Sequence, residues 1–290
     1  MTPTIRSATR PAALALALSM TAAACAPKHV TLPSGRGSPT TEFLAPFEQA
    51  STACRAVRTI RTSIHLSGRA ASERMRGTLI AGFERPDSMR LEGVAPFGPP
   101  VFILAARGGS ATLLLPRDNR VLTGASAADI LDALAGVRLE PAALRAILSG
   151  CVAPDPHPSA GYVFNTDGPI TIGQGTTGHP RKTWLVLDMD GGATVYLRQQ
   201  QGRWRIAAGR LPGLEVQYDQ FEGGLPRQIE ILSNPNETSA VPVDLSLALS
   251  DVSTNIALNP AAFTIDVPAD AVPMTLNELR EVGPLGVKGK

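Results

Sequence analysis

Short runs in which apolar and polar residues alternate make up most of the chain from residue 62 to 123 and again from 161 to 268. Alternation with a period of two predicts strands, and clusters of Gly, Pro, Asp and Asn between the runs predict turns. Evenly spaced strands joined by short turns predict an antiparallel meander. The expected strands are residues 63–69, 76–84, 88–94, 101–107, 110–115 and 120–122, followed by 184–188, 194–198, 203–207, 214–218, 228–232, 243–249 and 263–267.

One helix is expected before the first strand. Apolar residues recur every three or four positions over residues 43–57, which is the spacing of one helical face. Pro46 is tolerated only in a first turn, so the helix begins at Thr41 or at Ala45. This spacing places Cys54 on the apolar face.

Two shorter helices are expected between the two strand-rich parts. Ser126 is a suitable N-cap, with Asp129 three residues later, and Gly136 ends this helix. Pro141 begins the second helix at its first position and Gly150 ends it. Each helix has an apolar stripe: Ile130, Leu131 and Leu134 on the first, and Leu144, Ile147 and Leu148 on the second.

The connection between the strands at 88–94 and 101–107 carries an unusual side chain. Phe97 lies between Pro96 and Gly98, where a loop normally has polar residues. A large apolar group on a loop stiffened by proline either packs back onto its own core or is presented outward, to a membrane or an apolar ligand. The sequence leaves both open.

These segments together resemble the LolA and LolB family of bacterial lipoprotein carriers, and its LolB branch in particular. The matching LolB pattern is an Asn-Pro-Leu-Gly loop with an exposed leucine, followed by two helices that each end in Leu-x-Gly. In this chain the loop reads Ala95-Pro96-Phe97-Gly98, and the helices end in Leu134-Ala135-Gly136 and Leu148-Ser149-Gly150. Phe97 takes the place of the leucine. The resemblance covers about residues 42–268 and is most specific over 88–151.

The resemblance implies a mainly β fold with some α: an incomplete antiparallel β-barrel, or half barrel, with helices that cover an apolar cavity. The stripes of the two short helices would then line a cavity for acyl chains, although such stripes are more often ordinary core. The candidates are Leu131, Leu134, Leu144, Ile147 and Leu148.

The function implied by the resemblance is not catalytic. A protein of this kind is a monomer that accepts the acyl chains of lipoproteins from a soluble LolA-like carrier and places them in the outer membrane. The loop of Pro96, Phe97 and Gly98 would be its membrane-inserting tip. Other hypotheses are a lipid or glycolipid carrier, a sensor of the same fold, or an envelope scaffold with a packed interior. The remaining hypothesis is that the protein is an enzyme.

Residues 1–24 have the pattern of a lipoprotein signal peptide. A basic start is followed by an apolar stretch too short to span a bilayer and by small residues before Cys25. We expect Cys25 to be lipidated and to anchor the protein on the outer membrane, facing the periplasm, because Ala26 rather than Asp follows it. The alternative is an ordinary secretory signal and a soluble periplasmic protein. Residues 25–40 then form a flexible tether, 41–268 the half-barrel domain, and 269–290 a surface tail.

Charge and composition exclude some partners. The chain has 27 Lys and Arg and 25 Asp and Glu, and two of the arginines lie in the signal segment, so the rest is formally neutral. This balance gives no support for nucleic-acid binding, which would require a clustered basic face. No later segment has eighteen uninterrupted apolar residues, so no membrane span is expected after the signal. The 43% of hydrophobic residues is enough for a sizeable core.

Cys54 and Cys151 remain once Cys25 is assigned to the anchor. An exported protein meets oxidising conditions, so we expect a disulfide between them, with two buried free thiols as the alternative.

Catalytic, cofactor and metal motifs are not found. Residues 173–178 fit G-x-G-x-x-G, but a His-Pro pair follows where a helix should begin. Asp188 and Asp190 stand at a strand end beside a turn, as in a solvated edge. We therefore expect no catalytic residue, no cofactor and no metal. The four histidines are scattered without ligand spacing: His29, His65, His157 and His179.

Overall fold

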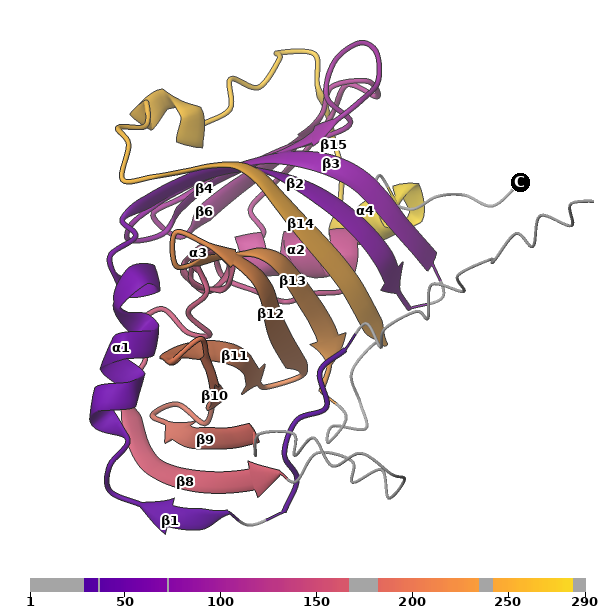
Figure 1. The fold of residues 1–290 in the computed structure, drawn as a ribbon. Helices are drawn as coiled ribbons and strands as arrows, with labels where there is room; N and C mark the ends of the chain where they lie inside the picture. The colour runs from indigo at the N-terminus through magenta and orange to yellow at the C-terminus, as the bar shows by residue number, and fades with distance from the viewer. Residues whose placement is uncertain (1–28, 36, 72, 167–181, 235–241, 284–290) are drawn as a thin grey trace, which may run out of the picture. The chain divides into compact units, whose positions relative to one another are not determined.

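The computed structural model describes residues 29–35, 37–71, 73–166, 182–234 and 242–283. The chain divides into two compact units, Met1–Val30 and Thr31–Lys290, and the described helices and strands belong to the second. This unit is built on one sheet of fifteen strands (Figure 1). The strands are β1 (Ser38–Thr40), β2 (Thr59–Ala70), β3 (Glu73–Glu84), β4 (Ser88–Val94), β5 (Ile103–Arg107), β6 (Ser110–Leu115), β7 (Arg120–Thr123), β8 (Pro158–Thr166), β9 (Lys182–Met189), β10 (Thr194–Gln200), β11 (Arg203–Leu211), β12 (Leu214–Glu222), β13 (Leu225–Ser233), β14 (Val243–Thr254) and β15 (Val272–Pro273).

The sheet order joins the two strand-rich parts of the sequence in one layer. Strands β8 to β14 form a meander, β2 to β7 form another, and β14 pairs with β2 to connect them. In that pairing Val243 faces Ala70 and Leu247 faces Leu66. β1 and β15 stand at opposite edges, so the sheet does not close. The predicted fold class, mainly β with an incomplete antiparallel barrel, is confirmed.

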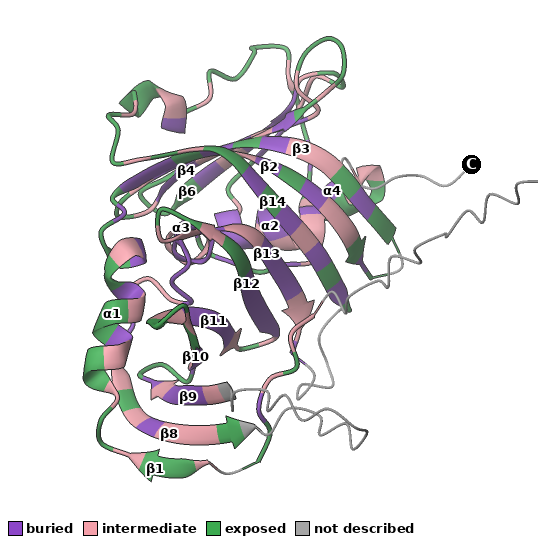
Figure 2. Ribbon diagram, viewed as in Figure 1, coloured by how far each residue is buried: buried purple, intermediate pink, exposed green. Residues whose placement is uncertain are grey.

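Side chains along the strands alternate between a buried and a more exposed face (Figure 2). On β3, for example, Met75, Leu79 and Phe83 are buried, while Arg74 and Arg76 on either side of Met75 are exposed. The buried face is the concave side, around which the sheet curves in Figure 1. The period-two pattern of the sequence therefore determines which side of each strand faces the core.

The two short helices have the predicted ends. α2 (Ala127–Ala135) begins at Ser126, whose side chain accepts a hydrogen bond from the Asp129 amide, and ends at Gly136 with φ of 67°. α3 (Pro141–Ser149) has Pro141 at its first position and ends at Gly150 with φ of 92°. Both glycines adopt the left-handed conformation that residues with a Cβ disfavour.

The first helix, α1 (Leu44–Arg55), lies against β11 at one end of the sheet, with Phe47 and Cys54 buried. It begins at Leu44, one residue before the predicted alternative Ala45 and three after Thr41, and Pro46 falls in its first turn as expected. None of the helices among the described residues is long and apolar enough to cross a bilayer.

The sequence predicts a strand at residues 263–267, and this prediction is wrong. The chain forms the 3₁₀ helix η1 (Pro260–Phe263) there, and no strand follows until β15. Asn259 accepts a hydrogen bond from the Ala261 amide and starts this turn, which Pro260 favours. Phe263 is buried where η1 packs beside β4 and β5, so its apolar character reflects this packing and not strand pairing.

Several elements were missed. β1 lies at the end of the predicted tether, and β8 and β15 were not expected. Helix α4 (Leu276–Val282) lies in the segment predicted as a surface tail, where it packs against α2. Thr275 and Glu278 form a complete capping box, and Leu279 is fully buried.

Candidate functional site

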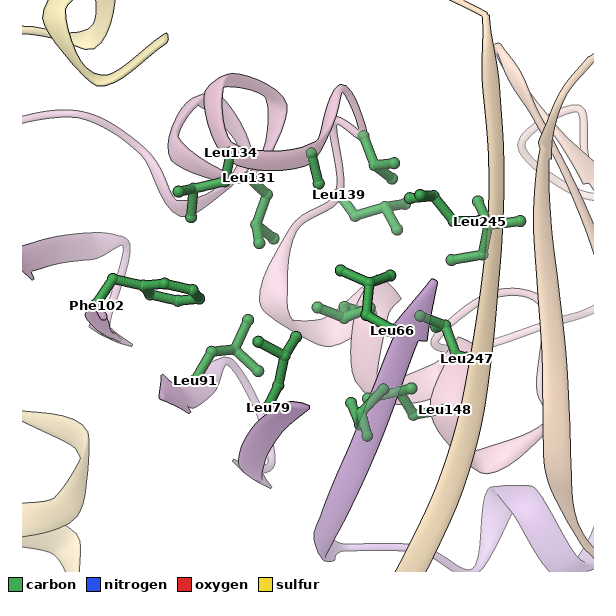
Figure 3. A pocket seen from close by; sticks show the side chains of 15 residues that line it. Leu66, Leu79, Leu91, Phe102, Leu131, Leu134, Leu139, Leu148, Leu245 and Leu247 are labelled. Carbon is green, nitrogen blue, oxygen red and sulfur yellow. The ribbon is translucent and has the colours of Figure 1, made fainter. Parts of the chain in front are cut away.

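A cavity of about 80 Å³ lies between the concave face of the sheet and helices α2 and α3. All fifteen residues that line it are apolar, and they come from the sheet and Phe102, just before β5, on one side and from the two helices and their connection on the other. Figure 3 shows Leu131 and Leu134 of α2 facing Leu79 and Leu91 of the sheet across the space. Because the lining offers no polar partner, water gains nothing by entering it.

Four of the five side chains proposed from the sequence as cavity lining reach it: Leu131, Leu134, Leu144 and Leu148. Ile147 does not line the cavity. It is fully buried in the general core, because one turn of α3 cannot direct Ile147 and Leu148 to the same side.

The strand side of the cavity was not predicted residue by residue. Leu66 of β2 pairs with Leu247 of β14, far away in the sequence, and both line the cavity. Period-two alternation indicated that each leucine faces inward. Only the pairing of β2 with β14, which no local pattern reveals, brings them together.

The cavity is smaller than a ligand pocket. Sites that enclose small molecules usually measure about 300 to 1,000 Å³, whereas this one holds about 80 Å³. The leucines of α2 and α3 occupy the space between helices and sheet. A ligand of ordinary size would fit only if these helices moved away from the strands.

α3 is fastened at its end by a covalent bond. Cys54, in the last turn of α1, and Cys151, directly after the end of α3, form a disulfide with 5.5 Å between their Cα atoms. Arg145 of α3 is also buried and donates from Nη1 to the Val57 carbonyl at 3.2 Å. Burial, with the nearby Arg85 guanidinium, lowers the pKa of Arg145.

α2 is held by exposed polar contacts. Asp132 accepts a hydrogen bond from Arg280 of α4 at 3.1 Å, and Asp129 forms an ion pair with Arg138. The Ser126 hydroxyl and the Arg138 guanidinium lower the pKa of Asp129. Ion pairs of this exposed kind contribute little to stability because solvent and salt screen them. α2 is therefore held by weaker polar contacts than α3.

The loop between β4 and β5 presents Phe97 to solvent. The Phe97 side chain is 89% exposed, the largest value among the exposed large hydrophobic residues described. Gly98 has φ of 78°, a left-handed conformation that a glycine accommodates. Of the two alternatives from the sequence, the structure has the outward one, and Phe97 does not pack on the core.

The base of this loop touches the cavity. The Gly93 amide donates a hydrogen bond to the Phe102 carbonyl at 3.0 Å, and the Phe102 ring covers Gly93 so closely that a Cβ on Gly93 would lie 2.7 Å from it. Phe102 is itself buried and lines the cavity. One hairpin therefore carries both the exposed tip and part of the cavity lining.

Several predicted features fall outside the described residues: Cys25, the signal segment, residues 173–178 and His179. In the described part of the chain, no group of three or more His, Cys, Asp or Glu could hold a metal ion. Asp188 is half-buried and Asp190 is exposed at the β9–β10 turn, as expected for a solvated edge.

No family model and no curated protein matches the sequence. Solved structures are similar at low identity. A LolA superfamily protein from Nitrosomonas europaea is 12% identical over 76% of this chain and 96% of its own, with a TM-score of 0.46. A DUF1329 family protein from Desulfovibrio piger is 11% identical over 76% and 96%, with a TM-score of 0.45. A putative outer membrane lipoprotein-sorting protein domain from Vibrio parahaemolyticus is 11% identical over 71% and 88%, with a TM-score of 0.37. At these values none of the three assigns the chain to a family.

Proposed function

We propose that this protein binds acyl chains of lipids or lipoproteins in the cavity under α2 and α3 and performs no covalent chemistry. One observation carries the proposal: the cavity is lined entirely by apolar side chains, with helices rather than strands covering it. A hydrocarbon chain makes no demand for hydrogen bonds, so such a lining suits it. Displacing water from each buried methylene contributes about 0.8 kcal/mol.

The finer proposal is a LolB-like role. In it, Cys25 carries a lipid anchor on the periplasmic side of the outer membrane, a soluble LolA-like carrier delivers a lipoprotein, and the Phe97 loop enters the bilayer during its release. The sequence pattern of residues 88–151 and the 89% exposure of Phe97 support this role. Burial of one phenylalanine contributes about 1.5 to 3 kcal/mol, which is too little to anchor a protein but enough to lower a transfer barrier.

The test is native mass spectrometry of the full chain with a diacylated lipopeptide and, as control, the same peptide without acyl chains. We expect a one-to-one adduct with the lipopeptide alone. Leu131→Glu places a carboxylate in the apolar space, and Leu144→Trp fills it without adding charge, so both should lose the adduct. Leu44→Glu changes a leucine that is 58% exposed on α1, away from the cavity, and should keep it.

A packed scaffold is the second candidate, because the cavity of about 80 Å³ is small. The same experiment separates the two. No adduct with the unmodified chain, at lipopeptide concentrations well above those that saturate acyl carriers, would favour the scaffold and contradict acyl binding.

A further inference from the structure

The loop that carries Phe97 has few hydrogen-bond donors. Pro96, Pro99 and Pro100 have no amide hydrogen, so only Phe97 and Gly98 donate from the backbone between positions 96 and 100. All five residues have a carbonyl. In water these carbonyls are hydrated, but in a bilayer each unpaired one costs free energy. The carbonyls are thus the main obstacle to inserting this tip.

Arg117 covers two of these carbonyls. It lies in the turn between β6 and β7, and its Nη2 donates to the Phe97 carbonyl at 2.6 Å while its Nε donates to the Pro99 carbonyl at 3.3 Å. A guanidinium presents several donors in a fixed plane, so one side chain can hold both sides of the tip. These bonds connect the tip to a strand pair that is separate from its own hairpin.

The turn that holds Arg117 is itself fixed. Asn119 donates from Nδ2 to the backbone and side chain of Asp270, at 3.0 Å in each case. The Asn119 carbonyl accepts from the Val272 amide at 2.8 Å, which continues into the pairing of β15 with β7. Arg117 therefore projects from a turn that is attached through Asn119 to the segment of Asp270 and Val272.

We infer that Arg117 is a positioning residue that holds Phe97 outward. Its guanidinium donates hydrogen bonds to the Phe97 and Pro99 carbonyls, so that these two carbonyls can leave water without losing a partner. The partner is the interfacial region of a lipid bilayer. The long alkyl stem of the arginine lets its charge remain at the level of the head groups while the ring enters deeper. This inference rests on the proposed function, because it assigns a role to the same tip.

The experiment measures how deeply position 97 enters a bilayer. Phe97→Trp is made in the full chain, which is mixed with vesicles of phosphatidylethanolamine and phosphatidylglycerol whose acyl chains are brominated. Bromine quenches indole fluorescence on contact. The signal of Trp184 and Trp204 is subtracted by measuring the same chain with Phe97 intact.

We expect bromine to quench the indole at position 97. Adding Arg117→Ala should reduce the inserted fraction about tenfold. Arg117→Lys, which can pair one carbonyl, should restore part of that fraction. The two hydrogen bonds that this variant loses, to the Phe97 and Pro99 carbonyls, together account for a factor of this size. The matched control is Arg107→Ala, which removes an exposed arginine from the opposite end of β5.

Three results would overturn the inference. Equal quenching with and without Arg117 would show that the tip needs no brace, and the proposed function would stand. Loss of the Arg117 effect in brominated phosphatidylcholine vesicles, which carry no net charge, would show that Arg117 binds anionic head groups instead. No quenching of Phe97→Trp in any vesicle would contradict the membrane role of the tip as well. An unchanged lipopeptide adduct in Arg117→Ala verifies that this variant is folded.

Discussion

Replacement of Leu148 by alanine tests whether the cavity under α2 and α3 is a binding site or a packing defect. Leu148 is fully buried and lines the cavity. Truncation of a buried leucine costs about 2.7 to 5 kcal/mol, rising by about 24 cal/mol for each Å³ left empty. The present void of about 80 Å³ already corresponds to about 2 kcal/mol at that rate. Because the deletion enlarges a void that the present structure already leaves unfilled, we expect a loss in the upper half of the range.

The matched control is Leu187→Ala. Leu187 of β9 is also fully buried, but it does not line the cavity. Both variants should therefore be destabilised by several kcal/mol, which lowers the melting temperature by about 2 to 4 °C for each kcal/mol in a chain of this size. They differ in what an acyl ligand can restore.

The assay is thermal unfolding of each full chain with and without a diacylated lipopeptide. A ligand at about a hundred times its dissociation constant stabilises the folded state by about 2.7 kcal/mol. We expect a larger ligand-induced shift for Leu148→Ala than for the unmodified chain, because its enlarged cavity regains packing from the acyl chain. The shift for Leu187→Ala should equal that of the unmodified chain. Equal shifts in both variants would refute acyl binding at this cavity.

Three further predictions concern the loop, the disulfide and a buried tyrosine. Phe97→Glu should leave the melting temperature unchanged and abolish lipoprotein transfer from a carrier to vesicles. Leu44→Glu, a change at another exposed apolar residue, should leave transfer intact. Normal transfer by Phe97→Glu would show that the loop takes no part in the mechanism. Replacing Cys54 and Cys151 by serine opens a loop with a sequence separation of 97 and should lower the free energy of unfolding by up to about 4.7 kcal/mol. Urea unfolding measures this loss, and a loss below about 1 kcal/mol would contradict the chain-entropy argument. Burial raises the pKa of Tyr218 above its ordinary value, so the unfolded state loses its proton first and stability should fall as the pH rises above about 10. Tyr218→Phe should reduce that fall in urea titrations from about pH 9 to 11, and an unchanged fall would contradict it.

The elements that follow from local chemistry were predictable from the sequence. β4 and β6 have the expected bounds, and α2 and α3 have the expected caps, because alternation, Ser126, Pro141 and the two terminal glycines act over a few residues. α4 could have been found in the same way, since Thr275 and Glu278 are a readable capping box. It was missed because its seven residues are few for a periodic pattern.

Elements that depend on distant partners were not predictable. β1 contains only three residues, of which Pro39 disfavours a strand interior and Thr40 alone has strand propensity, and it is a strand because it pairs with β8. The cavity shows the same limit: its helical side follows from the stripes of α2 and α3, whereas its strand side depends on the pairing of β2 with β14. Local patterns fix the face that a side chain takes, and the strand order fixes its neighbours.

The strengths of the two helix attachments indicate which helix would move more easily if the cavity of about 80 Å³ widened for the acyl chain of the proposed function. α3 is joined to α1 by the Cys54–Cys151 disulfide and is held by the buried Arg145, so its displacement would have to break buried contacts around a covalent link. α2 is held to α4 by an exposed ion pair from Asp132 and by packing around Leu279 on a helix of only seven residues. A helix of that length has little stability of its own. Separation of α2 from α4 and from the strands would thus break an exposed ion pair and apolar contacts but no covalent link, and it would open the space from the side on which Leu131 and Leu134 now cover the strands (Figure 3).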